Sequence, residues 1–245
     1  MKEERGKRKQ KQQTKKQNKK TKNTTTMEYN TRGKVLKKAV VWQNLYFYRK
    51  SDAIYRITVE FCKRFLPAHG DRTVDQMVQA ARSGKQNIVE GSEDGRTSSE
   101  MEIKLMNVAR GSLQELRADY HDYLNTHRLA AWDKESERQQ RLRDFCHSHN
   151  DYSDYEPLLA KMNDEEMANL ALTLCHQADR LMCTYIEGLE KQFVTEGGIK
   201  ERMHAARTGY RQEVDARLKA LEAENARLKA ENEELKRRLG EARRG

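Results

Sequence analysis

Apolar residues recur every three or four positions along four long segments, and this spacing constrains the fold more than any other feature of the chain. Such spacing places the apolar side chains on one face of an α-helix. The segments are 45–66, the stretch between Asp71 and Gly91, 98–129, and the stretch from Asn163 to Gly197. Helices that are each hydrophobic on one side must bury those sides together. We therefore expect an all-α protein built as an antiparallel up-and-down four-helix bundle.

Polar and glycine-bearing turns mark the expected helix ends. Asp71 is placed to cap the second helix, and Gly91 is expected to stop it, because glycine adopts the left-handed C-terminal conformation at little cost. Thr97 and Glu100 have the spacing of a capping box that would open the third helix. Asn163 precedes an acidic first turn and is expected to cap the fourth helix.

The third predicted helix carries a Gly-Ser pair, Gly111 and Ser112, within or beside its apolar stripe. Glycine costs about 1 kcal/mol inside a helix relative to alanine. The pair therefore favours a close helix crossing, where small side chains let two backbones approach. A glycine that the helix merely tolerates is the alternative.

The bundle domain is expected to span residues 27–195, with an insertion at 130–162 that is polar and irregular. At most one short helix is predicted in the insertion, around 135–147. A suffix or linker follows at 196–212, and it reads "GGIKERMHAARTGYR" over most of its length.

A heptad repeat sets residues 213–243 apart and predicts a C-terminal coiled-coil helix. The d positions are Val214, Leu221, Leu228 and Leu235, and the a positions are Leu218, Asn225, Asn232 and Leu239. Charges at g and e are complementary in a parallel pair, as Arg217 with Glu222 and Glu224 with Lys229 illustrate. Asparagine at a positions favours a dimer. A long solvated single helix is the alternative.

The net charge of +10 is concentrated at the N-terminus. Residues 1–26 hold 11 of the 48 Lys and Arg residues and 2 of the 38 Asp and Glu residues, which leaves 37 basic and 36 acidic residues in the rest. The tail has almost no aliphatic residue and is expected to be disordered. It would act as a sequence-independent phosphate-binding arm or as a solubilising tail, unless translation begins at Met27.

No motif in the chain indicates enzymatic chemistry, so we expect no enzyme, no cofactor and no small-molecule substrate. The stretch "FCHSHND" brings Cys146, His147 and His149 together, but without the paired spacing of a zinc module. Cys175 and Cys183 are expected to be core thiols. Unpaired cysteines, no membrane-length apolar run and no apolar segment after the basic N-terminus favour a cytoplasmic protein.

Charges divide the two flanks of the third predicted helix. Arg110, Arg117, His121 and Arg128 fall on one side of the apolar stripe, while Glu115, Asp122 and Glu100 fall on the other. Three interpretations remain open. The flanks would pair between subunits in a head-to-tail ring, the basic flank would hold phosphates, or the charges would be solvated.

The stretch "SGKQNIVEGSEDGRTSSEMEIKLMNVARGSLQEL" resembles the central signature of the bacterial four-helix bundle proteins. That family includes proteins encoded in intervening sequences of ribosomal RNA genes and accessory variability proteins of diversity-generating retroelements. The resemblance covers about 45–129 and 163–195, and the suffix is similar to one found in a subgroup. The matching positions are Asn87, Ile88, Glu90, Gly91, Gly111, Ser112, Leu113, Glu115 and Leu116.

This resemblance implies a homo-oligomer, in particular a ring of five subunits, together with nucleic-acid binding and association with a reverse transcriptase. The chain departs from the pattern at Ser83-Gly84-Lys85, where relatives often have proline, and in its insertion and coiled coil. A dimeric coiled coil does not match fivefold symmetry. Two rings would pair, the coiled coil would recruit another protein, or the ring would be absent.

Two functions follow as expectations. The first is a nucleic-acid-associated scaffold, with RNA or DNA phosphates held by Arg110, Arg117, His121, Arg128 and Lys85 and with Gly111, Ser112 and Glu115 at subunit contacts. The second is a protein-interaction module without nucleic-acid binding, organised by the coiled coil through Leu221, Asn225, Leu228, Asn232 and Leu235. A third, weaker hypothesis is a zipper-type DNA binder whose sparse basic region is Lys200, Arg202, Arg207 and Arg211.

Overall fold

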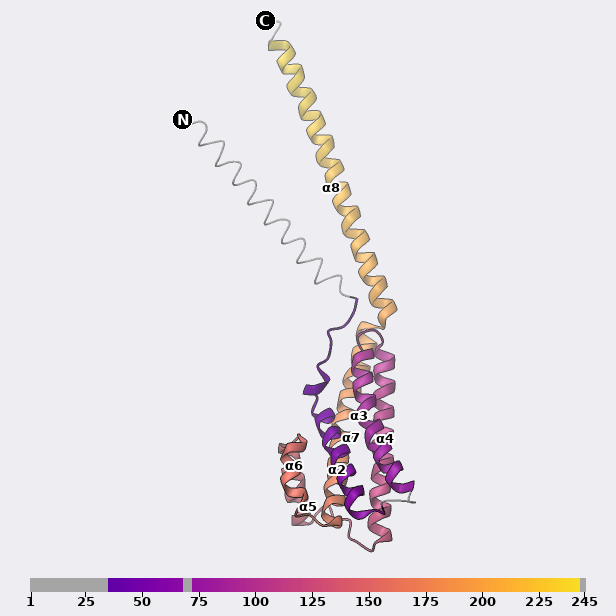
Figure 1. The fold of residues 1–245 in the computed structure, drawn as a ribbon. Coiled ribbons are helices and arrows are strands. Elements are labelled where there is room, and N and C mark those ends of the chain that lie inside the picture. Colours follow the sequence, from indigo (N-terminus) through magenta and orange to yellow (C-terminus); the bar gives the residue numbers. More distant parts are fainter. Residues whose placement is uncertain (1–34, 68–71, 243–245) are drawn as a thin grey trace, which may run out of the picture. The chain divides into compact units, whose positions relative to one another are not determined.

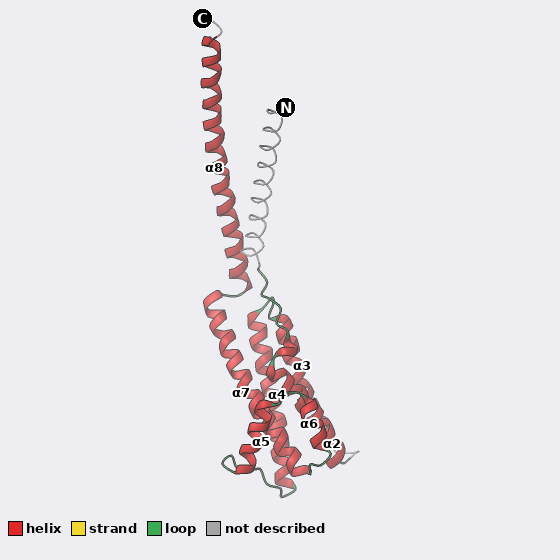
Figure 2. Cartoon of the chain, turned by 90° about the vertical axis from the view of Figure 1, so that its left-hand side faces the viewer, coloured by secondary structure: helices red, strands yellow, loops and turns green. Residues whose placement is uncertain are grey.

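The computed structural model describes residues 35–67 and 72–242, and every regular element in these ranges is a helix (Figures 1 and 2). The prediction of an all-α protein is therefore confirmed. The basic tail of residues 1–26, the alternative start at Met27 and the expected cap Asp71 lie outside the described residues. Among the described helices, none combines the length and apolar composition that a membrane span requires.

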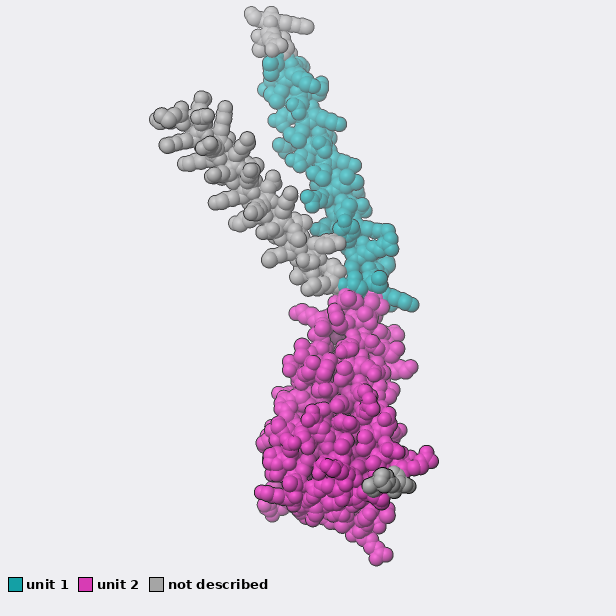
Figure 3. Space-filling view, viewed as in Figure 1, with its two compact units in different colours: residues 1–35, 200–245 teal, residues 36–199 magenta. Residues whose placement is uncertain are grey.

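The chain divides into two compact units, coloured separately in Figure 3. One unit spans residues 36–199, and the other combines residues 1–35 with 200–245. The first unit opens with a short 3-10 helix, η1 (Trp42–Asn44). Its α-helices are α2 (Tyr46–Phe65), α3 (Arg72–Asp94), α4 (Ser99–Thr126), α5 (Glu137–Ser148), α6 (Tyr152–Leu159) and α7 (Asp164–Glu196).

Four long helices of this unit enclose one core. α3 packs against α4, α4 against α7, α7 against α2, and α2 against α3, so the contacts form a closed circuit. Figure 1 shows these helices side by side. Their largest fully buried side chains come from all four helices: Ile54, Ile57, Phe61, Met77, Ile88, Met106, Leu113, Leu116, Tyr120, Leu124 and Met167.

The turn between α3 and α4 differs from the prediction. α3 continues through Gly91 to Asp94, so the expected stop at Gly91 is wrong. The reason is packing, since a Cβ built on Gly91 would lie 3.2 Å from the Cβ of Leu105 on α4. The predicted Thr97–Glu100 capping box is also wrong, because Ser98 caps α4 by accepting a hydrogen bond from the Met101 amide.

The start of α7 agrees with its prediction. The Asn163 side chain accepts a hydrogen bond from the Glu166 amide at 2.8 Å, and the Glu166 carboxylate accepts one from the Asn163 amide at 3.0 Å. Two free amides at the helix start are thereby satisfied reciprocally.

The close helix crossing lies on α3 rather than at Gly111. A Cβ on Gly84 would lie 2.9 Å from Leu113 Cδ2, whereas a Cβ on Gly111 would meet no described atom within 4 Å. The expected crossing at Gly111 is therefore not found within the chain. Ser112 does face α3, and its hydroxyl lies 3.1 Å from that of Ser83.

The insertion at 130–162 is more ordered than expected. α5 confirms the predicted short helix, and α6 was missed. Basic side chains of α2 fasten the insertion to the core. Arg49 pairs with Asp151, and the buried Lys50 ammonium donates to the carbonyls of Cys146 and His149. The Arg64 guanidinium donates to the carbonyls of Leu159 and Met162 at 2.6 and 2.8 Å.

Helix α8 (Ile199–Ala242) makes up most of the described part of the second unit. It starts after Gly197 and Gly198, three residues into the predicted linker at 196–212, and then runs without a break to Ala242 in the predicted coiled coil. None of its described side chains is buried.

Candidate nucleic-acid interface

A pocket of about 610 Å³ lies among α4, the segment before α5, α5 and α7. We call it the basic pocket, because four arginine or lysine side chains and two histidines line it, and no carboxylate does. These six residues are Arg117, His121, Lys134, Arg143, His176 and Arg180. Of the residues predicted to bind phosphate, the structure brings Arg117 and His121 together here.

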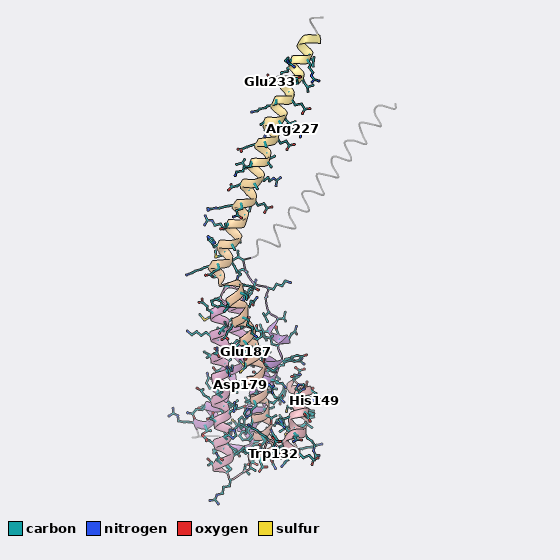
Figure 4. The ribbon with its side chains drawn as sticks, turned by 180° about the vertical axis from the view of Figure 1, so that it is seen from behind. Trp132, His149, Asp179, Glu187, Arg227 and Glu233 are labelled. Carbon is teal, nitrogen blue, oxygen red and sulfur yellow. The ribbon has the colours of Figure 1, made fainter. Side chains whose placement is uncertain are left out.

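A second hollow of about 990 Å³ continues from the basic pocket, since both share Arg143, Gln177 and Arg180 as lining residues. It adds the basic residues Lys50 and His147 and a single carboxylate, that of Asp144. We call the two hollows together the basic groove. In Figure 4, Trp132, which lines the basic pocket, lies toward one end of the helices, and Asp179 lies further along α7.

Burial and the positive charges that line the basic pocket lower the pKa of one of its histidines, His176. The pKa of His176 is lowered, first by burial and then by the charges of Arg117, Lys134 and His121, while Asp179 opposes the shift. A histidine surrounded in this way is held neutral, because each nearby cation disfavours its protonation. The pocket therefore carries an excess of positive charge that an anion would relieve.

Among the described residues, Arg117 differs from the other cations of the pocket in having a buried polar atom without a partner. Its Nε atom is buried and has no hydrogen-bond partner in the described part of the chain. A buried donor without a partner costs free energy that a bound acceptor would recover.

Trp132 is held in the wall of the pocket by α7. Its indole Nε1 donates to Glu165 Oε1 at 2.8 Å, and its backbone amide donates to Asn169 Oδ1 at 2.9 Å. The Arg138 guanidinium lies 3.8 Å from the centre of its ring. The hydrogen bond from Trp132 holds the pKa of Glu165 below its ordinary value, so this carboxylate stays ionised and fixed.

Three predicted phosphate ligands lie outside the lining of the basic pocket. Arg110 is engaged by Asp179, with 2.9 Å between Nε and Oδ1. The Lys85 ammonium lies 3.2 Å from Asp52 Oδ1 and 4.5 Å from the centre of the Tyr55 ring. Arg128 is exposed beyond the end of α4, with a positive φ of 57°.

Sequence reasoning missed four cations of the pocket: Lys134, Arg143, His176 and Arg180. Helix phase can group residues on one helix, but these come from the insertion and α7. The packing of α4 against α7 brings His176 and Arg180 to Arg117, and the packing of α5 against α7 adds Arg143. The pairing of Trp132 with Lys134 in "AAWDK", at the start of the insertion, was the available signal.

The three predicted subunit contacts on α4 have different surroundings. Ser112 is buried against Ser83 of α3. Gly111 borders open space. Glu115 lines a separate hollow with Asp119, and the pKa of Asp119 is raised by burial and then by the charges of Asp122 and Glu115. This acidic flank is distinct from the basic groove.

The heptad positions of α8 form a continuous exposed seam. Leu221, Leu228 and Leu235 are 48%, 46% and 50% exposed. Asn225 and Asn232 are exposed between them. Lys236 pairs with Glu233, three residues before it on α8. The other charges at the predicted interhelical positions form no ion pair within the described residues: Arg217, Glu222, Glu224, Lys229 and Glu231.

The cysteine and histidine residues near α5 do not converge. Cys146 is buried, and burial raises the pKa of its thiol to about 12, whereas His147 is exposed. In ranges 35–67 and 72–242, no three His, Cys, Asp or Glu side chains are placed to share a metal ion. Cys175 is buried and Cys183 half-buried, and both are free thiols.

No protein family, curated protein or solved structure matches this chain. Its function is therefore inferred from the basic groove and the exposed seam.

Proposed function

We propose that the protein is a non-enzymatic, oligomeric four-helix bundle that acts as a nucleic-acid-associated scaffold, with RNA as its ligand. The observation that carries this proposal is the convergence of six cationic or titratable basic side chains on a pocket whose lining has no carboxylate. Phosphate contacts supply nearly all of the non-specific affinity and a large share of the specific affinity of proteins for nucleic acids, and arginine frequently binds phosphate in a bidentate manner.

The groove is a better phosphate site than the basic flank of α4 taken alone. Arg110 already has Asp179 as its counter-ion, and Lys85 has Asp52. Arg117 has an unpartnered buried Nε and lies among other cations. A polyanion would therefore gain the most binding free energy at Arg117, Arg143 and Arg180. Arg128 and the N-terminal arm would add electrostatic attraction that does not require a fixed position of the phosphates.

The antiparallel up-and-down bundle is supported by the closed circuit of helix contacts and by two short connections. Few residues separate α2 from α3 and α3 from α4. Short connections favour antiparallel neighbours. The insertion would then be the single long crossover, and it supplies one wall of the groove.

The resemblance to the bacterial four-helix bundle proteins adds the proposed partners. A ring of five subunits and association with a reverse transcriptase are part of the proposal on that ground. Open space beside Gly111 and the separation of acidic Glu115 from the basic groove are compatible with a head-to-tail contact between subunits.

The test is RNA binding as a function of salt, measured by fluorescence anisotropy on the full chain. Each phosphate contact to single-stranded RNA contributes about −0.7 to the slope of log affinity against log salt. Combining Arg117→Ala, Arg143→Ala and Arg180→Ala should weaken binding and reduce the slope by about 2. A slope near zero for the wild type would reject phosphate binding.

A matched control removes three exposed lysines outside the groove, through Lys104→Ala, Lys161→Ala and Lys191→Ala. It loses the same formal charge and should bind RNA nearly as the wild type does. Equal losses in both triple variants would show that overall charge, rather than the groove, determines binding. Comparing the full chain with one that starts at Met27 measures the contribution of the tail.

The exposed seam favours a second candidate function, that of a protein-interaction module organised by α8. A row of half-exposed leucines is costly in water and is relieved when a second helix covers it. We propose a parallel dimer, because asparagines occupy two a positions and unpaired charges flank the seam. In sedimentation equilibrium, Leu221→Glu with Leu228→Glu should lower the assembled mass, and an unchanged mass would reject the seam as organiser.

A further inference from the structure

We infer that the basic pocket holds one unpaired nucleotide, so that the groove selects single-stranded RNA over duplex RNA. This inference rests on the proposed function, because it specifies which RNA the same site takes. It starts from three buried polar atoms without a hydrogen-bond partner in the described part of the chain: Arg117 Nε, Gln139 Oε1 and Gln177 Oε1. All three residues line the basic pocket.

The orientation of the Gln139 amide follows from its neighbours. The Thr173 hydroxyl donates its proton to the Asn169 carbonyl at 2.8 Å. The Thr173 oxygen can therefore only accept from Gln139, and it does so from Nε2 at 3.0 Å. Because the amide nitrogen is committed to Thr173, Gln139 Oε1 is fixed as a free acceptor.

The orientation of the Gln177 amide is fixed in the same way. Its Nε2 donates to the Arg143 backbone carbonyl at 3.0 Å, and a carbonyl accepts only from a donor. Gln177 Oε1 is therefore a second free acceptor. The walls of the pocket thus contain one buried donor on a cation and two buried acceptors that have no partner among the described residues. A ligand in the pocket would meet these three atoms when their side chains turn toward it.

A phosphate group alone does not match this set of atoms. A fully ionised phosphate diester accepts hydrogen bonds and donates none, so it satisfies Arg117 and leaves both glutamine oxygens unpaired. A nucleotide unit carries an anionic phosphate together with N–H groups on its base. These N–H groups are the donors that separate it from a duplex, because a duplex also displays its ribose hydroxyls. The volume of about 610 Å³ lies in the range of pockets that hold small organic ligands.

Pairing decides which RNA can supply these groups. In a duplex the base edges are engaged with the opposite strand, and the major groove of A-form RNA is too deep and narrow for side chains to read. In a single strand a base can leave the stack and present its edge to a pocket. The neighbouring phosphates would then follow the groove past Arg143 and Arg180, which line both hollows.

The experiment compares two ligands on the full chain by competition against a labelled, unstructured RNA of about 20 nucleotides. One competitor is the same strand unlabelled, and the other is that strand annealed to its complement. We expect the single strand to compete at least about tenfold better at equal phosphate concentration, as two or more added hydrogen bonds would give. Equal or better competition by the duplex overturns the inference.

A double variant tests whether the glutamines cause the preference. Gln139→Leu with Gln177→Leu removes both acceptors and leaves every cation in place. We expect its affinity for single strands to fall toward its affinity for duplex, with an unchanged salt slope. Retained duplex binding shows that the variant is folded, and an unchanged preference for single strands overturns the inference.

These results separate the two proposals. If both RNAs bind equally and with a steep salt slope, the proposed function stands and the inference fails. If neither RNA binds, or if the salt slope is near zero, the proposed function fails and the inference fails with it.

Discussion

The helices around the core and helix α8 are both amphipathic, yet they bury their apolar faces differently. In the first unit, Ile54, Phe61 and Met106 are fully buried against other helices of the same chain. On α8, Leu221 and Leu228 remain about half exposed. The spacing explains the difference, because a wide stripe with a period near 3.6 fits into a core, whereas a narrow seven-residue repeat fits one facing helix. Periodicity therefore indicates which kind of partner a helix needs.

Arg110 and Arg117 show that the availability of a charged side chain also depends on its neighbours from other helices. They lie two turns apart on α4, yet Arg110 is paired with Asp179, and Arg117 has an unpartnered Nε. Both were predicted to bind phosphate from helix phase alone. Which of them is available depends on what α5 and α7 place opposite each one.

The largest effect on stability should come from a cavity in the core of the first unit. Phe61 is fully buried and packs on Phe65, Tyr120 and Tyr123. Phe61→Ala should lower the free energy of unfolding by about 3–5 kcal/mol in urea titrations. Leu228→Ala on α8 should cost far less when measured at a protein concentration too low for association. Similar losses of unfolding free energy in the two variants would contradict the proposed difference between the buried core helices and the exposed α8.

A smaller loss of stability should follow when the contacts between Lys50 and the insertion at 130–162 are removed. Lys50→Met removes a donor from the carbonyls of Cys146 and His149. The His149 carbonyl keeps the Tyr155 hydroxyl as a donor at 2.6 Å, so the unmet acceptor is the carbonyl of the buried Cys146. We expect a loss of about 1–3 kcal/mol, together with faster amide hydrogen exchange in α5 and α6. Lys63→Met, on an exposed position of the same helix, is the control. If the Lys50 variant is as stable as this control, Lys50 does not stabilise the packing of the insertion against the core.

Two glycine substitutions should change stability in opposite directions. Gly84→Ala pushes a Cβ to within 2.9 Å of the buried Leu113 and should cost about 1–3 kcal/mol. Gly111→Ala has open space in this chain and should stabilise the helix by up to about 1 kcal/mol. Thermal unfolding measures both effects. A Gly111 variant that unfolds earlier and has a smaller assembled mass would show that another subunit contacts α4 there.

The smallest effect concerns pH. Because its pKa is lowered, His176 is neutral near pH 7 in the free protein, and a bound phosphate would favour its protonated form and raise that pKa. RNA binding should therefore take up protons and strengthen as pH falls from 8 to 6. The charged or titratable groups around His176 come from every wall of the pocket: Arg117, His121, Lys134, Arg143, Asp179 and Arg180.

The comparison for this pH effect uses two histidine variants. His176→Gln should reduce the gain in affinity between pH 8 and pH 6 by about two- to threefold. His204→Gln on α8 should leave the gain unchanged. Identical pH profiles for the His176 variant and the wild type would contradict a bound anion beside this imidazole.

The sequence predicted the four long helices and the α7 cap, because these depend on local spacing and on side chains that reach their own backbone. It failed at Gly91, where packing against Leu105 prevails over the tendency of glycine to end a helix. It also missed α6, where Asp151 and Asp154 form a capping box that the sequence reading did not weigh. The groove could not be predicted, because it joins Arg117 to Arg143 and Arg180 across separate helices.

The most direct test is to locate the RNA by ultraviolet crosslinking of the full chain, followed by mass spectrometry of the crosslinked peptides. Crosslinks should concentrate in peptides that contain Trp132, Arg143 and the segment from His176 to Arg180, and they should be lost in the Arg117, Arg143 and Arg180 triple variant. Crosslinks confined to residues 1–26 or to α8, with none in the groove, would contradict the account.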